Sequence, residues 1–198
     1  MPDLSAVSVR SHCPLPFRVL MVCTGNLHRS PLAERLLTAR LGSSREMFRV
    51  SSAGTAARAG TPMDPVAAAL LAGLGGDPYG AVARRLTVEL VESADLVLGA
   101  AAEHRDVAVR LSPAWALRRA FTLREFARLL RADDAAGVGE PPDRAAELVR
   151  GAGARRGSEG PGEDDDVADP YGAPEQVARS CAARIAESVE RIAVAVRG

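Results

Sequence analysis

A strand–loop–helix pattern near the start of the chain constrains the fold more than any other feature. Residues 17–22 (FRVLMV) form a short apolar run of the length expected for a buried strand. After a loop, apolar positions recur at helical spacing over residues 32–41. Ser30 and Pro31 suit a helix start, because serine caps helices and proline fits the first helical position. The pattern therefore places the loop, residues 23–30, between the end of a strand and the beginning of a helix.

Strands and helices continue to alternate along the chain. We expect further strands at residues 48–52 and 94–98. Helices are expected at residues 62–74, 88–93, 122–130 and 174–196, with one more beginning near residue 102. Thr122 and Glu125 have the spacing of a capping box at the start of one of these helices. The alternation predicts an α/β domain with a parallel sheet that is covered by helices on both faces.

The chain divides into a leader and one domain. Residues 1–16 make a poor signal peptide, because their apolar residues are interrupted and basic residues are scarce, and we expect a flexible leader. Residues 17–198 are long enough for one domain with one core. Within this domain, residues 135–166 are rich in Gly, Pro, Asp, Glu and Arg. We expect a flexible surface excursion there, with a helix only over residues 143–150.

Composition excludes several classes of protein. The 25 basic and 25 acidic residues balance, and no apolar run approaches membrane-spanning length, so neither nucleic-acid binding nor membrane insertion is expected. The three cysteines, Cys13, Cys23 and Cys181, include no CxxC pair and give no basis for a disulfide scaffold or a zinc site. We therefore expect a cytoplasmic protein without a cofactor or a metal.

The loop after the first strand is suited to binding an anion. A tight loop that leads into a helix points several backbone N–H groups inward, and the helix N-terminus adds positive potential. A Walker loop needs a lysine, which this chain lacks, and no GxGxxG pattern follows a strand. The sole asparagine of the chain, Asn26, lies inside this loop. The sequence thus predicts an anion-binding loop with Cys23 at its start and Arg29 at its end.

Cys23 and Arg29 together indicate phosphoryl transfer. Positive potential from the amides and the guanidinium favours the thiolate, which is the nucleophilic form of cysteine. Arg29 offers a planar fork that holds two phosphoryl oxygens through the transition state, and Ser30 could donate its hydroxyl to the thiolate. Attack would form phosphocysteine and divide one difficult displacement into two easier ones. The alternative interpretation of Cys23 is a small buried residue at a strand end.

The segment VCTGNLHRSPLAE resembles the signature of the low-molecular-weight protein tyrosine phosphatases, a family with a phosphate loop of this form close to the N-terminus. The resemblance continues through residues 52–55 (SAGT), 94–98 (ADLVL) and 103–105 (EHR), and it ends in residues 169–172 (DPYG). It covers most of residues 17–197. It implies a single-domain, four-stranded parallel sheet flanked by helices, the Rossmann-like fold of these phosphatases.

The resemblance also implies roles for individual residues. Asp169 would be the general acid, which protonates the leaving phenolate and later accepts a proton from the water that cleaves phosphocysteine. Asp166 is the next candidate for this role. Asn26 would hold the loop in shape, and Tyr171 would form a wall of the substrate cleft. The phosphate-binding residues would be Thr24, Gly25, Asn26, Leu27, His28, Arg29 and Ser30.

The partners that the resemblance implies are a phosphotyrosine-containing protein as the substrate, with a bacterial tyrosine kinase as one candidate, and inorganic phosphate as the product. Three departures from the family pattern affect the surroundings of the loop. His28 stands where the family commonly has a second cysteine, and Ala81 stands where it has a histidine that supports the loop. Arg58 takes the place of an aromatic residue at the rim of the cleft.

Two alternatives to a tyrosine phosphatase remain at this point. A thioredoxin-coupled arsenate reductase shares the scaffold, but its resolving cysteines should lie together on a mobile loop, whereas Cys13 and Cys181 are far apart in sequence. A phosphate- or phosphotyrosine-binding module with little activity would also retain the loop. Metal-independent hydrolysis of p-nitrophenyl phosphate distinguishes the enzyme from the binding module.

Overall fold

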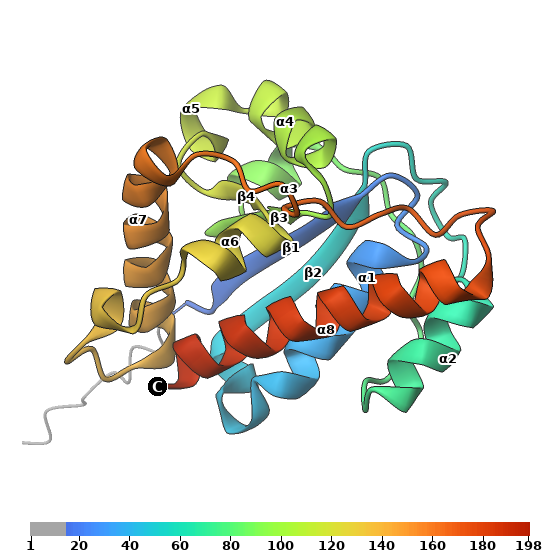
Figure 1. The fold of residues 1–198 in the computed structure, drawn as a ribbon, viewed down its shortest axis with the longest axis horizontal. Coiled ribbons are helices and arrows are strands. Elements are labelled where there is room, and N and C mark those ends of the chain that lie inside the picture. Colours follow the sequence, from blue (N-terminus) through green and yellow to red (C-terminus); the bar gives the residue numbers. More distant parts are fainter. Residues whose placement is uncertain (1–14) are drawn as a thin grey trace, which may run out of the picture.

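The computed structural model describes residues 15–198, so the expected leader, including Cys13, lies almost wholly outside the described residues (Figure 1). The strands are β1 (Phe17–Cys23), β2 (Phe48–Gly54), β3 (Leu96–Gly99) and β4 (Ala120–Thr122). The α-helices are α1 (Arg29–Arg40), α2 (Pro65–Gly73), α3 (Val88–Glu92), α4 (Ala102–Leu111), α5 (Pro113–Ala116), α6 (Leu123–Leu129), α7 (Pro141–Glu159) and α8 (Glu175–Arg197). Two 3-10 helices, η1 (Gly42–Met47) and η2 (Ala132–Ala135), complete the set.

The four strands form one parallel sheet in the order β2-β1-β3-β4. β1 lies at the centre and pairs along its whole length with β2, from Phe17 opposite Phe48 to Cys23 opposite Gly54. All but one residue of β1 is buried, as expected for a central strand of a parallel sheet covered on both faces. The α/β fold predicted from the sequence is therefore confirmed.

Helices cover both faces of the sheet (Figure 1). One face packs on α1, α2, α6, α7 and α8, and it holds the larger apolar core, which includes Leu36, Phe121 and Ile185. The other face packs on α3, α4 and α5 over a smaller core around Val22 and Val97. Among residues 15–198, no helix is both long and apolar enough to cross a lipid bilayer.

The first helix begins slightly earlier than the sequence suggested. The N-cap position of α1 is His28, whose side chain makes no capping hydrogen bond, rather than Ser30. Ser30 lies inside the first turn, and its hydroxyl contacts the thiol of Cys23 instead. Serine commonly caps helices, but the hydroxyl of Ser30 contacts the thiol instead, because the first turn of α1 directly continues the loop.

The region expected to be a flexible excursion contains a 19-residue helix, α7, so the expectation of helical structure over residues 143–150 alone was wrong. Its buried apolar residues, Ala145, Leu148, Val149 and Ala152, belong to the larger core, and the helix packs on α8 and α6. Arg156 stacks on the ring of Phe121 at 3.8 Å and pairs with the buried Glu125 at 2.9 Å. Contacts of this arginine therefore hold the second half of α7 to the domain, where the helix has few apolar residues to bury. The division of the chain into leader and domain stays a prediction.

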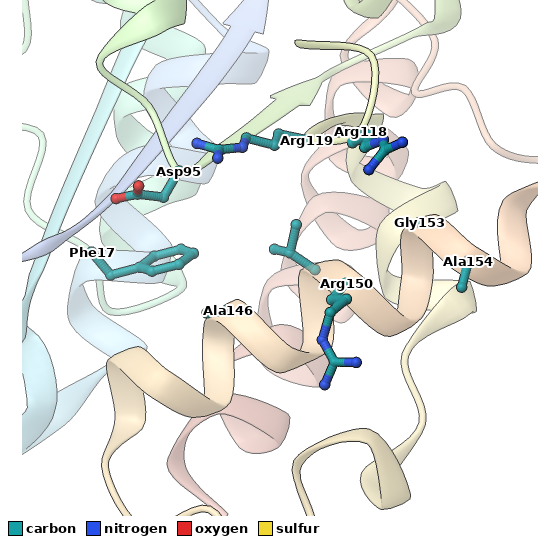
Figure 2. A pocket seen from close by; sticks show the side chains of 9 residues that line it. Phe17, Asp95, Arg118, Arg119, Ala146, Arg150, Gly153 and Ala154 are labelled. Carbon is teal, nitrogen blue, oxygen red and sulfur yellow. The ribbon is translucent and has the colours of Figure 1, made fainter. Parts of the chain in front are cut away.

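A hollow of about 590 Å³ lies at the amino ends of the strands (Figure 2). Phe17 at the start of β1 and Asp95 before β3 face α7 across it, and Arg118, Arg119 and Arg150 line its rim. Cys23 is at the opposite, carboxyl end of β1. Ligands of open α/β sheets bind outside the carboxyl ends of the strands, so the size of this hollow does not make it the candidate active site.

Candidate active site

The loop from Cys23 to Arg29 is held by its carbonyl groups. Three of them accept hydrogen bonds from the backbone that follows β2: Thr55 N to Cys23 O, Ala56 N to Thr24 O and Asp64 N to Leu27 O, each 2.9 Å. The amides of Gly25, Leu27 and His28 make no hydrogen bond among the described residues. Carbonyls that are bound on the outside leave the amides free for an anion on the inside.

Gly54, at the end of β2, allows this close approach. A Cβ added there would lie 2.5 Å from the carbonyl oxygen of Thr24 and 2.9 Å from the amide nitrogen of Asn26. Only glycine therefore fits against the loop without a shift of backbone. Gly54 belongs to the segment SAGT, but packing of this kind has no local sequence signal.

The thiol of Cys23 lies buried at the base of the loop. Its Sγ is 2.9 Å from the hydroxyl oxygen of Ser30 and 3.3 Å from the amide nitrogen of Asn26. Both groups can donate to sulfur, and a negatively charged sulfur accepts such hydrogen bonds best. The sulfur of Cys23 is thus placed to accept two hydrogen bonds at the base of the loop.

Asn26 connects the loop to the rest of the sheet. Its backbone is in the left-handed region (φ 56°), which asparagine tolerates better than most residues. Its Nδ2 donates to the hydroxyls of Ser30 (2.9 Å) and Ser52 (2.8 Å), and its Oδ1 accepts from the amide of Arg84 (2.9 Å). All hydrogen-bonding atoms of this buried amide are engaged, which fixes the loop in one conformation.

Two residues that the sequence analysis did not single out extend this network. Glu34 on α1 accepts from the hydroxyl of Ser52 at 2.5 Å. The guanidinium of Arg84 donates to the carbonyl of Ser52, so Arg84 holds both Asn26 and β2. Ala81, the position of the missing family histidine, is partly buried nearby. From the sequence alone, Glu34 looks like an ordinary charged residue on the solvent-exposed face of α1.

Arg29 is buried, with its side chain 5% exposed, and its guanidinium reaches across to the segment before α8. Nη1 donates to the carbonyl of Val167 at 3.2 Å, and Nη2 donates to the hydroxyl of Thr24 at 3.3 Å. Nη2 also donates to the carboxylate of Asp169 at 2.5 Å. The structure thus brings Cys23, Arg29 and Asp169 together, although 140 positions separate Arg29 from Asp169.

The segment that carries Asp169 is fastened to the β3–α4 turn. The amide of Val167 donates to the carbonyl of Ala100, and Asp166 accepts from the amide of Ala102, each at 2.8 Å. Asp166 is thereby engaged at the start of α4, while Asp169 faces Arg29 and is about half exposed. Of the two carboxylates considered for the acid, Asp169 has the position beside the loop.

The remaining predicted site residues lie at the edge of the loop. Leu27 and His28 are partly buried, and Tyr171, two residues after Asp169, has a ring that is almost fully exposed. The ring nitrogens of His28 are buried without a hydrogen-bond partner among residues 15–198. Burial lowers the pKa of His28, against the opposing influence of Asp64 and Asp169, so this imidazole favours its neutral form.

The described part of the chain holds no metal site, and its second cysteine lies on α8, where the charges of Arg29 and Asp169 influence its pKa. Residues 15–198 contain no cluster of three or more His, Cys, Asp or Glu side chains suited to a metal ion. Cys181 lies buried on α8, and burial raises the pKa of its thiol to about 12. Arg58, at the expected rim of the cleft, is exposed.

Fold and site together define an α/β protein with a thiol at the base of a loop whose carbonyls are bound and several of whose amides are free. The family model of the low molecular weight phosphotyrosine protein phosphatases matches residues 18–150, which is more than half of the chain. The chain therefore belongs to this family, as the sequence analysis predicted.

Individual relatives agree with this assignment. The chain is 38% identical over 95 residues to the low molecular weight protein-tyrosine-phosphatase Etp of Escherichia coli, which corresponds to 48% of this chain and 62% of Etp. A longer match, 28% identical over 90% of this chain and 95% of the relative, is to a protein-arginine-phosphatase of Geobacillus stearothermophilus. A solved low molecular weight protein tyrosine phosphatase from T. tengcongensis superposes with a TM-score of 0.65 at 29% identity, covering 88% of this chain and 96% of that one.

Proposed function

We propose that the protein is a protein tyrosine phosphatase that hydrolyses phosphotyrosine monoesters through a phosphocysteine intermediate on Cys23. The observation that carries the proposal is the convergence of three groups on one loop: the thiol of Cys23, the guanidinium of Arg29 and the carboxylate of Asp169. Each supplies a function that phosphoryl transfer needs, namely a nucleophile, a fixed cation and a proton donor.

In the first step, the Cys23 thiolate attacks phosphorus and the S–P bond forms while the P–O bond to the phenol breaks. The free amides of the loop and Arg29 hold the three equatorial oxygens, on which charge is spread in the transition state. Asp169 in its protonated form gives a proton to the phenolate, which is a poor leaving group because phenol has a pKa of about 10. Phosphocysteine and a neutral phenol result.

In the second step, water attacks phosphocysteine and the S–P bond breaks. The Asp169 carboxylate accepts a proton from this water, and inorganic phosphate leaves. Ser30 and the amide of Asn26 stabilise the departing thiolate, because both contact Sγ. The same carboxylate thus acts as acid and then as base, and no external reagent other than water is needed.

Phosphoarginine is a second candidate substrate, because the longer of the two matches is to an arginine phosphatase. Cleavage of a P–N bond would need the same thiolate and the same acid, so the catalytic groups do not discriminate. The apolar side chain of Leu27, which lies against Gly25 on the loop, and the aromatic Tyr171 beside Asp169 favour an aromatic substrate. A phosphotyrosine-containing protein, including a bacterial tyrosine kinase, is therefore the preferred partner, and the site needs no cofactor.

Arsenate reduction has less support. A reductase needs a second thiol that can attack a cysteine adduct, and the buried thiol of Cys181 has a pKa of about 12, which makes it a poor nucleophile near neutral pH. Cys13 lies outside the described residues.

Hydrolysis of p-nitrophenyl phosphate tests the proposal. Wild-type protein should turn over this substrate in the presence of EDTA, and Cys23→Ser should lower kcat by about 10⁴-fold or more. Cys181→Ala is the matched control, because it removes the other described cysteine, which lies on α8 rather than in the loop, and it should retain activity. A binding module would show neither turnover nor a difference between these variants.

Phosphopeptide substrates distinguish a tyrosine phosphatase from an arginine phosphatase. We expect kcat/KM for a phosphotyrosine peptide to exceed that for the phosphoarginine peptide of the same sequence by at least about tenfold. The reverse order would identify the protein as an arginine phosphatase with the same mechanism.

A further inference from the structure

His104 is a buried histidine that the proposed mechanism does not yet use. It lies in the first turn of α4 and is 1% exposed. Its Nδ1 is 3.1 Å from the backbone nitrogen of Ala101, which can only donate, so Nδ1 must accept. A neutral imidazole that accepts at Nδ1 carries its proton on Nε2. The local backbone of α4 therefore selects the tautomer of this ring.

The protonated Nε2 points at the phosphate loop. It lies 2.9 Å from the hydroxyl oxygen of Thr24, the residue next to Cys23. It also lies 3.4 Å from the carboxylate of Glu103, but that side chain is 73% exposed, so the contact with Thr24 is the shorter and the less solvated of the two. The imidazole thus donates its one proton to Thr24.

Thr24 in turn contacts Arg29. The hydroxyl oxygen of Thr24 accepts from Nη2 of Arg29 at 3.3 Å, in addition to the bond from His104. Two donors occupy both acceptor sites of a hydroxyl, so its own hydrogen must point in a third direction. Hydrogen bonds of fixed polarity, from Ala101 to His104, from His104 to Thr24 and from Arg29 to Thr24, therefore connect α4 with the guanidinium that is to hold the phosphoryl group.

The charge state of His104 agrees with this polarity. Burial, followed by the positive charge of Arg29 on α1, lowers the pKa of His104. Glu103 on its own helix and Asp166 and Asp169 on the segment before α8 act in the opposite direction but are outweighed. Protonation would put a hydrogen on Nδ1 against the amide of Ala101 and a second cation beside Arg29.

We propose that His104 is a positioning residue for phosphoryl transfer: its Nε2–H fixes the hydroxyl of Thr24, which in turn orients the guanidinium of Arg29 for the transition state. This inference rests on the proposed phosphatase activity. It assigns a role to the EHR segment beyond helix packing, and it explains why a titratable ring is buried next to a cation.

Suitable substitutions distinguish the positioning role of His104 from a role in holding the start of α4 alone. His104→Asn keeps an acceptor at the position of Nδ1, so it preserves the contact with Ala101 and loses the reach to Thr24. His104→Gln keeps a donor at the position of Nε2. Thr24→Val removes the hydroxyl at nearly constant volume, and Thr24→Ser retains it.

The test is steady-state hydrolysis of p-nitrophenyl phosphate by these variants and by the double variant His104→Asn/Thr24→Val. His104→Asn and Thr24→Val should each lower kcat about tenfold with KM changed by less than about threefold, because orientation of Arg29 matters most in the transition state. His104→Gln and Thr24→Ser should recover most of the loss. The double variant should be no slower than either single variant, since both break the same series of hydrogen bonds.

The pH dependence gives a second readout that helix capping does not move. The ratio of kcat for His104→Gln to kcat for wild type should rise as the pH falls below about 6.5, because only the wild type gains a proton at this position. Multiplicative effects in the double variant, or a His104→Asn variant with wild-type kcat, would overturn the inference while leaving the phosphatase proposal intact. A wild-type protein that hydrolyses no phosphate ester would overturn both.

Discussion

At the scale of single residues, the contact between Arg29 and Asp169 determines how the proposed site works. The carboxylate lies 2.5 Å from the guanidinium that would hold the phosphoryl group. A dianionic phosphoryl group would therefore compete with Asp169 for the same cation. In the proposed mechanism, a carboxylate that is released from its ion pair as the substrate binds would take up a proton and be free to approach the leaving group, which would couple binding to proton transfer.

Asp169→Asn should separate the role of Asp169 as a proton donor from its competition with phosphate for Arg29. We expect kcat for phosphotyrosine peptides to fall about 10²-fold, because the leaving phenolate loses its proton donor. Inhibition by inorganic phosphate should become stronger, because the neutral amide no longer competes for Arg29. The measurement is the inhibition constant for phosphate alongside kcat, with Asp166→Asn as the matched control on the same segment. Weaker phosphate inhibition in Asp169→Asn would contradict the competition.

At the scale of elements, the unit formed by β1, the loop and α1 depends on the neighbouring strand β2. Its last residue, Gly54, lies so close to the loop that a Cβ would collide with backbone atoms of Thr24 and Asn26. The conformation of the loop thus depends on its packing against β2 as well as on its own sequence.

Gly54→Ala should therefore damage the loop. We expect a loss of about 1–3 kcal/mol in the free energy of unfolding and at least about a tenfold loss of kcat/KM, because backbone must shift to admit the methyl group. Gly157→Ala in α7 is the control: a Cβ there meets no atom within 4 Å, so it should stabilise the helix by about 0.5–1 kcal/mol and leave activity unchanged. Urea denaturation and p-nitrophenyl phosphate assays measure both effects. Equal behaviour of the two variants would contradict the packing argument.

Elements with a strong local signal could be predicted from the sequence, and others could not. The apolar run of β1 and the capping box of α6 are local features, and both elements lie close to where they were expected. The predicted length of α7 was too short because Arg155 and Arg156 look like solvated charges in a sequence. In the structure, Arg155 bonds to the carbonyl of Leu129 and Arg156 to Glu125, and both hold the second half of the helix. Likewise, β4 has only three residues and no pattern of its own.

At the scale of the whole molecule, the candidate site depends on segments that only the fold brings together. Cys23, Arg29 and Asp169 could be identified from motifs, because the loop and the DPYG segment carry residue types with chemical meaning. The contacts of His104 and Arg84 with the loop could not, since they depend on how the β3–α4 turn and the segment after α2 lie against it. Sequence reasoning proposed the reacting groups, and the fold shows which residues contact them.

The two imidazoles beside the loop also make stability depend on pH. Burial lowers the pKa of both His28 and His104 from the ordinary value of 6.5 in the folded protein. A lowered histidine pKa means that the unfolded chain binds protons more readily, so this part of the stability is present above pH 6.5 and is lost as the pH falls through the folded pKa values. Between about pH 7.5 and about pH 5, the wild type should lose more free energy of unfolding than His28→Asn/His104→Gln. Urea denaturation at both pH values measures the difference, and equal losses would contradict the assignment.

The most direct test of the central claim is to trap the covalent intermediate. In the proposed mechanism, Asp169→Asn should slow the hydrolysis of phosphocysteine. A reaction of this variant with p-nitrophenyl phosphate, quenched and analysed by mass spectrometry, should therefore contain protein that carries one phosphoryl group. The release of p-nitrophenol should show a burst that is stoichiometric with the protein. We predict that the phosphoryl group is on the peptide that contains Cys23 and that Cys23→Ala abolishes it. A phosphoryl group on another residue, or turnover by Cys23→Ala, would contradict the mechanism.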